Sequence, residues 1–405
     1  MSENYYRKFI QIPAIFNNEN LLEFSIEPDK RSLSLKDSYL RFYVELAENF
    51  VPDNNFCNKL FEFLDLTINF EDVSFKSSNN DYDLTSMINN KIFQTSQFLK
   101  KFPFEGHFDE HNFDSSELKA NTDIIKHRRG TPFKKNVLVD GTAEEKTFYR
   151  YMLMFPINHG LTHAEAILPP GVHVRLTFHR ARAEKSLIDI SEEIDINYPD
   201  KVVKIMEPAF VGCWAFGKKL DTQLGRVSSS GLNIEYDSAH VRHKVLDEGL
   251  VNHRVEVSQG PLPESIIFFL MEPVRFANDF KLSSSKFEMH NLIEFSLLLD
   301  NVVQEHYPLK SFNYGNDKFN HTFYRRWLSQ TGKILDEGSD FLSEQDYLRS
   351  NFFIVENFED FVEKDGHLAV DLKFQGVFDT KLFLCWMPIQ RKILKFDRNL
   401  SVQVT

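Results

Sequence analysis

Short segments in which every second residue is apolar recur along most of this chain. In residues 39–46, YLRFYVEL, the apolar positions run from Leu40 to Leu46. Successive side chains of a β-strand point to opposite faces, so a period of two is typical of a strand with one buried face. The same period occurs in residues 64–75, 173–181, 264–272, 293–301, 367–375 and 380–387. In residues 64–75 the predicted buried face includes Phe70. Short strands of this kind, bounded by turn signals, predict an all-β sandwich.

A rigid corner separates two strand-like runs just after the midpoint of the chain. Residues 256–273 read EVSQGPLPESIIFFLMEP, and Gly260, Pro261 and Pro263 stand between the two runs. A proline has no backbone N–H and disfavours helix in the residue before it, so no helix passes through this stretch. The segment therefore predicts a turn between two strands.

Helical periodicity is scarce. The clearest candidates are residues 83–93 and residues 317–332, the second of which ends in a glycine suited to a helix C-terminus. Residues 105–147 contain long polar stretches, and we expect them to form a connection between strands. Connections of this length inside a compact domain are usually functional or mobile.

The length of the chain predicts two domains. It has 405 residues, and single hydrophobic cores stop growing at roughly 250 to 300 residues. We expect domains at residues 1–215 and 216–405, joined through the polar segment 214–233, which contains several Gly and Ser residues. No close repeat relates the two halves, but each opens with a strand, has a helix near its middle and closes on strands. The 40 phenylalanines favour strands and large packed cores.

Charge and cysteine content narrow the function classes. The net charge is −12, and no basic cluster is longer than the HRRG and FKK pieces within residues 127–135. This argues against a surface that neutralises many phosphates. If the protein interacts with nucleic acid, we expect it to enclose the nucleic acid rather than to bind its backbone tightly. Three cysteines far apart, Cys57, Cys213 and Cys385, indicate a reducing compartment. We expect neither a signal peptide nor a membrane span, because no apolar run reaches about 18 residues.

Three histidine groups are candidate metal sites, because neutral imidazole is a common metal ligand. They are His107 with Asp109 and His111, His159 with His163, and His240 with His243. Each group lies in a loop-like context, where the spacing does not converge ligands on one point as a His-Glu-x-x-His helix does. We therefore interpret all three as solvated loop histidines and assign no metal ligand.

Carboxylates are abundant but form no recognisable catalytic motif. Residues 80–83 (NDYD) and 109–114 (DEHNFD) cluster oxygen atoms suited to Ca²⁺, yet neither matches an EF-hand loop, and both are interpreted as polar surface loops. Residues 192–195 and 359–361 are interpreted as exposed charge. Nucleophile-elbow, phosphate-binding and dinucleotide-binding motifs are all absent from the sequence. We assign no catalytic or cofactor-binding residue and expect no enzyme activity.

Several longer motifs resemble one known family. They are SLKDSYLRFYVEL, LFEFLDLTINFEDVSF and ILPPGVHVRLTFHRARAEKSLI in the first half, and GPLPESIIFFLME, KFEMHNLIEFSLLLDN, PLKSF, FYRRWLSQTGKI and GHLAVDLKF in the second. Together they resemble the double jelly-roll major capsid protein of Polinton (Maverick) elements and their adintovirus relatives, which are large virus-like DNA transposons of animals. The resemblance spans about residues 9–400, and LPPGV and GPLP are its most distinctive parts. Asn357 and Phe358 depart from the family's acidic strand end.

The resemblance implies a fold and a function. The fold would be all-β, with two tandem antiparallel jelly-roll sandwiches and a few short helices in loops, and the GPLP corner would lead into the counterpart of residues 40–46. The protein would be a hexon-like capsomer subunit that forms a homotrimer and then a capsid lattice. That icosahedral shell would enclose double-stranded DNA without sequence-specific binding. Penton or minor capsid proteins would be its other partners. We assign no cofactor, although a chain this acidic would benefit from counterions such as structural Ca²⁺ where copies pack together.

The same resemblance places the protein in the virion capsid, made in the host cytoplasm and assembled in the cytoplasm or nucleus. Two other functions fit a tandem sandwich, since fold alone does not determine function. One is a metal-dependent enzyme that uses the histidine groups, and the other is a carbohydrate-binding protein. A minor or vertex capsid protein fits less well, because such proteins commonly carry one jelly roll.

Overall fold

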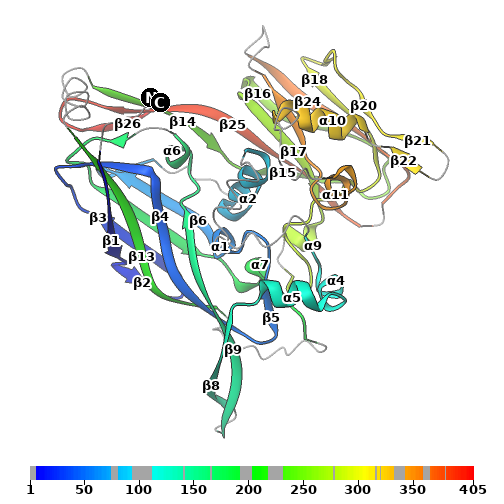
Figure 1. Ribbon diagram of the computed structural model, residues 1–405. Coiled ribbons are helices and arrows are strands. Elements are labelled where there is room, and N and C mark those ends of the chain that lie inside the picture. The colour runs from blue at the N-terminus through cyan, green and yellow to red at the C-terminus, as the bar shows by residue number, and fades with distance from the viewer. Residues whose placement is uncertain are drawn as a thin grey trace.

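The computed structural model consists mainly of antiparallel strands arranged as two sandwiches (Figure 1). It describes residues 6–73, 81–93, 112–139, 142–164, 167–191, 203–217, 231–276, 279–314, 317–319, 321–332, 343–358, 365–378 and 380–405. No helix among these residues is both long enough and apolar enough to cross a membrane.

The first sandwich is built from strands of the first half of the chain. One sheet has the order β1-β13-β4-β9-β8, with β10 paired to β4, and the facing sheet has the order β2-β3-β11-β6-β7. The short strands β5 and β12 pair separately. The strands are β1 (Tyr6–Pro13), β2 (Phe16–Asn17), β3 (Leu21–Ile26), β4 (Ser32–Ala47), β5 (Phe50–Pro52), β6 (Phe61–Ile68), β7 (Glu71–Asp72), β8 (Thr131–Val139), β9 (Thr142–Pro156), β10 (Ile167–Leu168), β11 (Val174–Arg180), β12 (Leu187–Asp189) and β13 (Val203–Phe216).

The second sandwich is built from strands of the second half. One sheet has the order β14-β25-β17-β23, with β15 and β26 paired to β25, and the other has the order β16-β24-β18-β19, with β20 paired to β18. The strands are β14 (Leu232–Ala239), β15 (Arg242–Leu246), β16 (Asn252–Pro261), β17 (Ser265–Met271), β18 (Leu292–Leu299), β19 (Val302–Val303), β20 (Leu309–Lys310), β21 (Phe312–Tyr314), β22 (Asp317–Phe319), β23 (Ile354–Asn357), β24 (Asp365–Phe374), β25 (Leu382–Phe396) and β26 (Val402–Val404).

The two sandwiches have the same topology. Eight strands of the first sandwich have counterparts in the second. In chain order the pairs are β1 with β14, β3 with β16, β4 with β17, β6 with β18, β7 with β19, β9 with β23, β11 with β24 and β13 with β25. The sheet β1-β13-β4-β9 then matches β14-β25-β17-β23, and β3-β11-β6-β7 matches β16-β24-β18-β19. Eight strands that alternate between two facing sheets in this order form a jelly roll. The predicted fold class, two tandem antiparallel jelly rolls, is confirmed.

The proline-containing corner connects the two sheets of the second sandwich. Gly260 and Pro261 still pair with β24, so the turn begins two residues later than the sequence predicts. Gly260 has a φ of 100°, a backbone conformation that glycine adopts without steric cost. The chain then crosses to β17, which lies between β25 and β23 just as β4 lies between β13 and β9. The corner therefore leads into the counterpart of β4, as the resemblance implied.

Three sequence predictions are wrong in detail. The strand predicted over residues 64–75 ends at Ile68, and residues 69 and 70 turn the chain into β7. Phe70 is 86% exposed rather than on a buried face. The helix predicted from residue 317 begins at His321, because residues 317–319 pair as β22.

Much of the predicted loop 105–147 is regular structure. Its described part contains α4, α5, β8 and the start of β9, and Figure 1 shows the β8–β9 hairpin extending away from the sandwich. The helices are α1 (Phe56–Lys59), α2 (Tyr82–Phe93), α4 (Ser115–Lys119), α5 (Thr122–Arg128), α6 (Gly160–His163), α7 (Ala183–Ser186), α9 (Pro273–Phe276), α10 (His321–Gln330) and α11 (Glu344–Ser350).

The cores of the two sandwiches draw on both halves of the chain. Helix α2, which the sequence predicted correctly, places Met87 and Ile88 in the apolar core of the second sandwich. In return, Ile234 and Tyr236 of β14 and Leu394 of β25 pack in the core of the first. Figure 1 shows α2 between the two sandwiches. Apolar side chains that are shared in this way hold the two jelly rolls in a fixed relative position.

Candidate assembly surface and inter-sandwich junction

Charged side chains are buried where the two sandwiches meet. Lys59, at the end of α1, is 0% exposed. Its ammonium group donates hydrogen bonds to Asp53 Oδ2 and Ser285 Oγ, each at 2.5 Å. Asp53 also accepts a hydrogen bond from Ser283 Oγ at 2.8 Å. Burial lowers the pKa of Lys59, while the Asp53 carboxylate opposes that shift. These bonds connect the first sandwich to a loop of the second.

A second buried cluster centres on Asp114, which precedes α4. Arg275 of α9 donates two hydrogen bonds to its carboxylate, at 2.7 Å to Oδ1 and 3.0 Å to Oδ2. Lys286 Nζ lies 3.2 Å from Oδ2, and the Ser283 N–H donates to Oδ1 at 2.8 Å. Burial opposes the charged form of Asp114, but the Arg275 and Ser283 hydrogen bonds outweigh it and hold the pKa below its usual value. The first half supplies this anion and the second half supplies the cations.

The junction clusters were missed by sequence reasoning. Asp114 was assigned to a polar surface loop with Ca²⁺-type ligands, which is wrong because the carboxylate is buried and accepts hydrogen bonds from Arg275 and Lys286. Its partners are more than 150 positions away, and no local pattern signals them. Residues 109–111 lie outside the described residues.

Another predicted oxygen cluster is also buried. Asp81 and Asp83, from the NDYD stretch, are 8% and 6% exposed at the start of α2. Asp81 accepts a hydrogen bond from the backbone N–H of Val241, in the second half. The polar-surface interpretation is therefore wrong for both residues. Asn80 and the charged stretches 192–195 and 359–361 fall in parts of the chain that the structure does not describe.

The first described histidine pair is only partly solvated. His159 is half-buried, its Nδ1 accepts from the Leu161 N–H at 3.2 Å, and its ring stacks on Tyr236 with centroids 5.9 Å apart. Burial lowers the pKa of His159 to about 4. The solvated interpretation is wrong for His159, because β14 covers it. The residue surface of His163 is exposed, but desolvation of its ring lowers its pKa to about 4, and its Nε2 pairs with Asn158 Oδ1 at 2.9 Å, so it is only partly solvated.

The second described histidine pair, His240 and His243, has one buried and one exposed member. His240 is 6% exposed, and its Nε2 accepts from Arg242 Nε at 2.7 Å. Burial lowers the pKa of His240 to about 4, so the solvated interpretation is wrong here too. His243 is exposed, as predicted. His107, Asp109 and His111 lie outside the described residues. Within the described ranges, no three His, Cys, Asp or Glu side chains are grouped to hold a metal ion.

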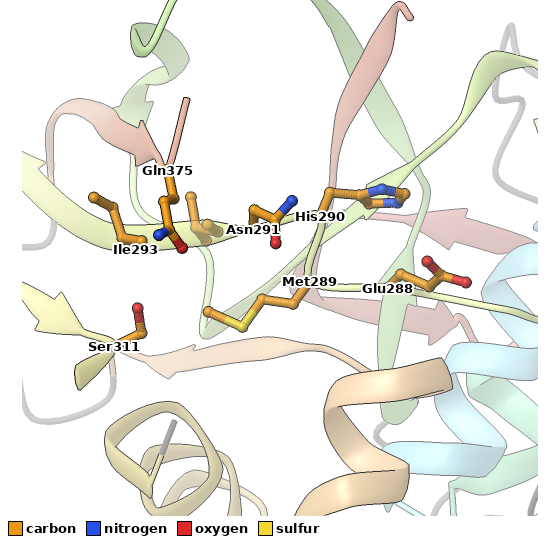
Figure 2. Close-up of a pocket in the computed structure, with 8 residues that line it drawn as sticks. Glu288, Met289, His290, Asn291, Ile293, Ser311 and Gln375 are labelled. Carbon is orange, nitrogen blue, oxygen red and sulfur yellow. The ribbon is translucent and has the colours of Figure 1, made fainter. Parts of the chain in front are cut away.

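A surface cavity of the second sandwich does not resemble a catalytic site. A cavity of about 300 Å³ is lined by residues 288–293, Ser311 and Gln375. Figure 2 shows His290 and Glu288 at one end and Gln375 and Ser311 at the other, with Met289 between them. A nucleophile and its base must lie within hydrogen-bond reach of each other. The lining side chains do not gather in that way.

Several aromatic and apolar side chains lie on the outer face of the β1-β13-β4-β9 sheet, among charged ones such as Arg41 and the Glu45–Arg150 pair. Over residues 39–46, the core side of β4 carries the residues with even numbers, so the odd-numbered ones of this stretch point outward. Phe9 is 52% exposed and Met152 is 37% exposed. The rings of Phe9 and Tyr39 lie 6.4 Å apart across the sheet, and Tyr43 pairs with Met152. We call these four residues, Phe9, Tyr39, Tyr43 and Met152, the outer apolar face.

The outer apolar face has the features of an interaction surface. Contiguous exposed apolar residues on a soluble protein mark sites where another molecule binds. The edge strand β1 adds unpaired backbone groups along its free side, which can pair with another strand. Sequence reasoning found the alternation of β4 but assigned its outward residues to solvent.

The fold matches solved structures of virus shells. A chain of the Sputnik virophage aligns with a TM-score of 0.62 at 9% identity, covering 99% of this chain and 88% of that one. The mavirus major capsid protein aligns with a TM-score of 0.52 at 9% identity over 98% of this chain and 90% of that one. The Faustovirus major capsid protein aligns with a TM-score of 0.52 at 7% identity, with 98% and 91% covered.

These comparisons establish the fold, because at such low identity the alignment reports architecture alone. No family model matches the sequence, and no curated protein matches it. The likeness extends over both sandwiches and the junction between them, since nearly the whole chain is aligned.

Proposed function

We propose that this protein is a viral major capsid protein, a hexon-like subunit of the Polinton or adintovirus type. The observation that carries the proposal is the tandem jelly-roll architecture, which matches major capsid proteins over 98% of the chain. The residues 1–215 and 216–405 form the two domains of the subunit, with the buried junction between them. The subunit has a structural role and no catalytic activity.

The subunit forms a homotrimer before it enters the shell. Three copies of a tandem jelly roll place six similar sandwiches around one axis, which gives a pseudo-hexagonal block. A permanent capsomer needs an obligate interface, and such interfaces typically bury more than about 2,000 Å² around an apolar centre. The outer apolar face and the free edge of β1 support such a contact.

The trimers assemble into an icosahedral lattice that encloses double-stranded DNA. The net charge of −12 supports enclosure without sequence-specific binding, because a chain this acidic does not attract phosphates. Penton or minor capsid proteins complete the shell. The protein is made in the host cytoplasm, assembles in the cytoplasm or nucleus, and resides in the virion capsid.

Light scattering of the purified protein, with electron microscopy of the same peak, tests this proposal. We expect a mass three times that of the 47.5 kDa chain at micromolar and nanomolar concentration. The trimer should survive moderate salt, because apolar burial is not screened as surface charge is. A monodisperse monomer at micromolar concentration and physiological pH would falsify the capsomer proposal. The enzyme and carbohydrate-binding alternatives would then become the leading ones.

A further inference from the structure

The turn between β6 and β7 presents a phenylalanine in an unfavourable backbone conformation. Asn69 and Phe70 have φ values of 48° and 71°. Residues with a bulky side chain rarely adopt positive φ, and two-residue hairpin turns of this kind prefer Asn or Gly. The corresponding turn of the second sandwich has Asp300 and Asn301, with φ values of 49° and 66°. The chain therefore uses the favoured residue type in one turn and phenylalanine in the other.

Phe70 is held rigidly and remains accessible. The Asn69 side chain accepts from the His173 N–H at 2.8 Å and donates to the Leu400 carbonyl at 2.7 Å. The Phe70 ring stacks on the His173 ring, with centroids 5.3 Å apart. Even so, Phe70 is 86% exposed. A strained and exposed aromatic residue whose position is fixed in advance is a good anchor for binding.

The turn is also acidic. Glu71 and Asp72 follow Phe70 in β7 and are exposed, and the side chain of Glu27 nearby is 78% exposed. The structure therefore presents one aromatic ring flanked by carboxylates. We call residues 69–72 the acidic knob.

A recess of complementary chemistry lies on the second sandwich. It has a volume of about 520 Å³ between α10 and β20 and is lined by His306, Leu309, His321, Thr322, Arg325 and Arg326. The volume is larger than one phenyl ring. Leu309 is a lining residue but is only 3% exposed, so the recess surface is formed mainly by the arginine and histidine side chains, and we call this the basic recess. Of these, His321 pairs with Glu344 at 2.5 Å. Arginine guanidinium groups also bind aromatic faces.

The two cationic arginines of the recess differ in their partners. Arg326 donates to Glu356 at 2.5 Å, which neutralises it within the sandwich. Arg325 is exposed and has no ion pair with any residue that the structure describes. Its charge is therefore available to the carboxylates of an incoming segment, and Glu71 carries one of them.

The acidic knob and the basic recess cannot meet within one chain. The knob is bonded to Leu400, just before β26, and Figure 1 shows β26 and α10 on opposite sides of the molecule. A contact between different patches of identical subunits is heterologous, and it generates a ring when the rotation closes.

We propose that the acidic knob of one copy binds the basic recess of a neighbouring copy, with the Phe70 ring in the recess and Glu71 near Arg325. This inference rests on the proposed homo-oligomer and names the residues that specify its contact. The opposite charges make the contact directional, because knob against knob and recess against recess repel.

Sedimentation equilibrium of full-length variants tests the contact. Phe70→Asn installs the residue type of the second turn, so the fold is retained, and Arg325→Glu reverses the charge of the recess. We expect each to raise the trimer dissociation constant about tenfold or more, as loss of an interface anchor does. Val302→Asn is the matched control, because Val302 is 65% exposed beside the corresponding turn and lies outside the knob. It should leave the constant unchanged.

The outcomes separate this contact from the proposed function. If the wild-type protein is a stable trimer and Phe70→Asn does not change its dissociation constant, the proposed role of the acidic knob is refuted and the capsomer proposal stands. If Phe70→Asn weakens the trimer but Arg325→Glu does not, the basic recess is not the binding site of the knob. A wild-type monomer overturns both proposals. Restoration of the trimer when Glu71→Arg is combined with Arg325→Glu supports the pairing directly.

Discussion

Replacement of Lys59 with alanine should loosen the junction between the two jelly rolls. In the native protein its ammonium group is fully buried and lies 2.5 Å from both Asp53 Oδ2 and Ser285 Oγ. The alanine variant leaves Asp53, which is 1% exposed, buried without its cation. Loss of one partner from a buried ion pair costs about 3–5 kcal/mol, because the remaining charge is uncompensated.

The remaining hydrogen bonds place this variant near the lower end of that range. Asp53 still accepts from Ser283 Oγ and from the backbone N–H of Asn54, each at 2.8 Å. We therefore expect a loss of about 3 kcal/mol in the free energy of unfolding. For about 200 residues that unfold together, 1 kcal/mol corresponds to about 2–4 °C, so Tm should fall by about 6–12 °C.

Thermal unfolding followed by circular dichroism, at one protein concentration, measures this change. Lys134→Ala is the control, because Lys134 pairs with Glu145 at 2.7 Å with both side chains more than half exposed, and such exposed pairs contribute little to stability. Lys59→Met combined with Asp53→Leu removes both charges and should recover most of the stability. The reasoning is refuted if Lys59→Ala lowers Tm no more than Lys134→Ala does.

Three further predictions concern His240, Gly160 and the histidine pair His107 and His111. Burial lowers the pKa of His240 from 6.5 to about 4. Between these two pH values the unfolded chain binds a proton at His240 that the folded chain does not bind. The free energy of unfolding therefore falls by up to about 3 kcal/mol as the pH is lowered from 6.5 to 4. His240→Gln should flatten this dependence in urea unfolding, and an unchanged slope contradicts it. Gly160→Ala should cost about 1–3 kcal/mol in the same assay, because a Cβ would lie 1.8 Å from a β14 carbonyl oxygen; equal stability of the variant would show that α6 can shift. Replacing His107 and His111 together with alanine should leave oligomer mass and bound metal unchanged, whereas loss of a stoichiometric zinc or copper ion in elemental analysis favours the enzyme alternative.

The strands could be read from the sequence because their signal is local. Residues 39–46 alternate because β4 packs one face on a core, and the same rule located β11, β17, β18 and β24. The prolines of the GPLP corner exclude helix through their own covalent geometry, whatever surrounds them. The helix at residues 83–93 was likewise predicted from its own residues.

Local signals failed where a turn lacks its usual residues. Asn69 and Phe70 continue the alternation of β6, so they were assigned to a strand. An Asn-Gly pair would have indicated a hairpin turn, but phenylalanine at the second position does not. Residues 317–319 were assigned to a helix in the same way, although they pair as β22.

Tertiary structure alone decided what the polar residues do. Lys59 and Asp114 look like solvated residues in the sequence, yet each is buried against a partner from a distant part of the chain. His240 is buried as well. A periodic apolar pattern indicates that a residue faces a core, but it does not indicate which core. The sequence therefore predicted α2 as a helix but not its position against the second sandwich. Strand periodicity depends on neighbours two residues apart, whereas burial of a charge depends on groups brought together only when both jelly rolls have folded against each other.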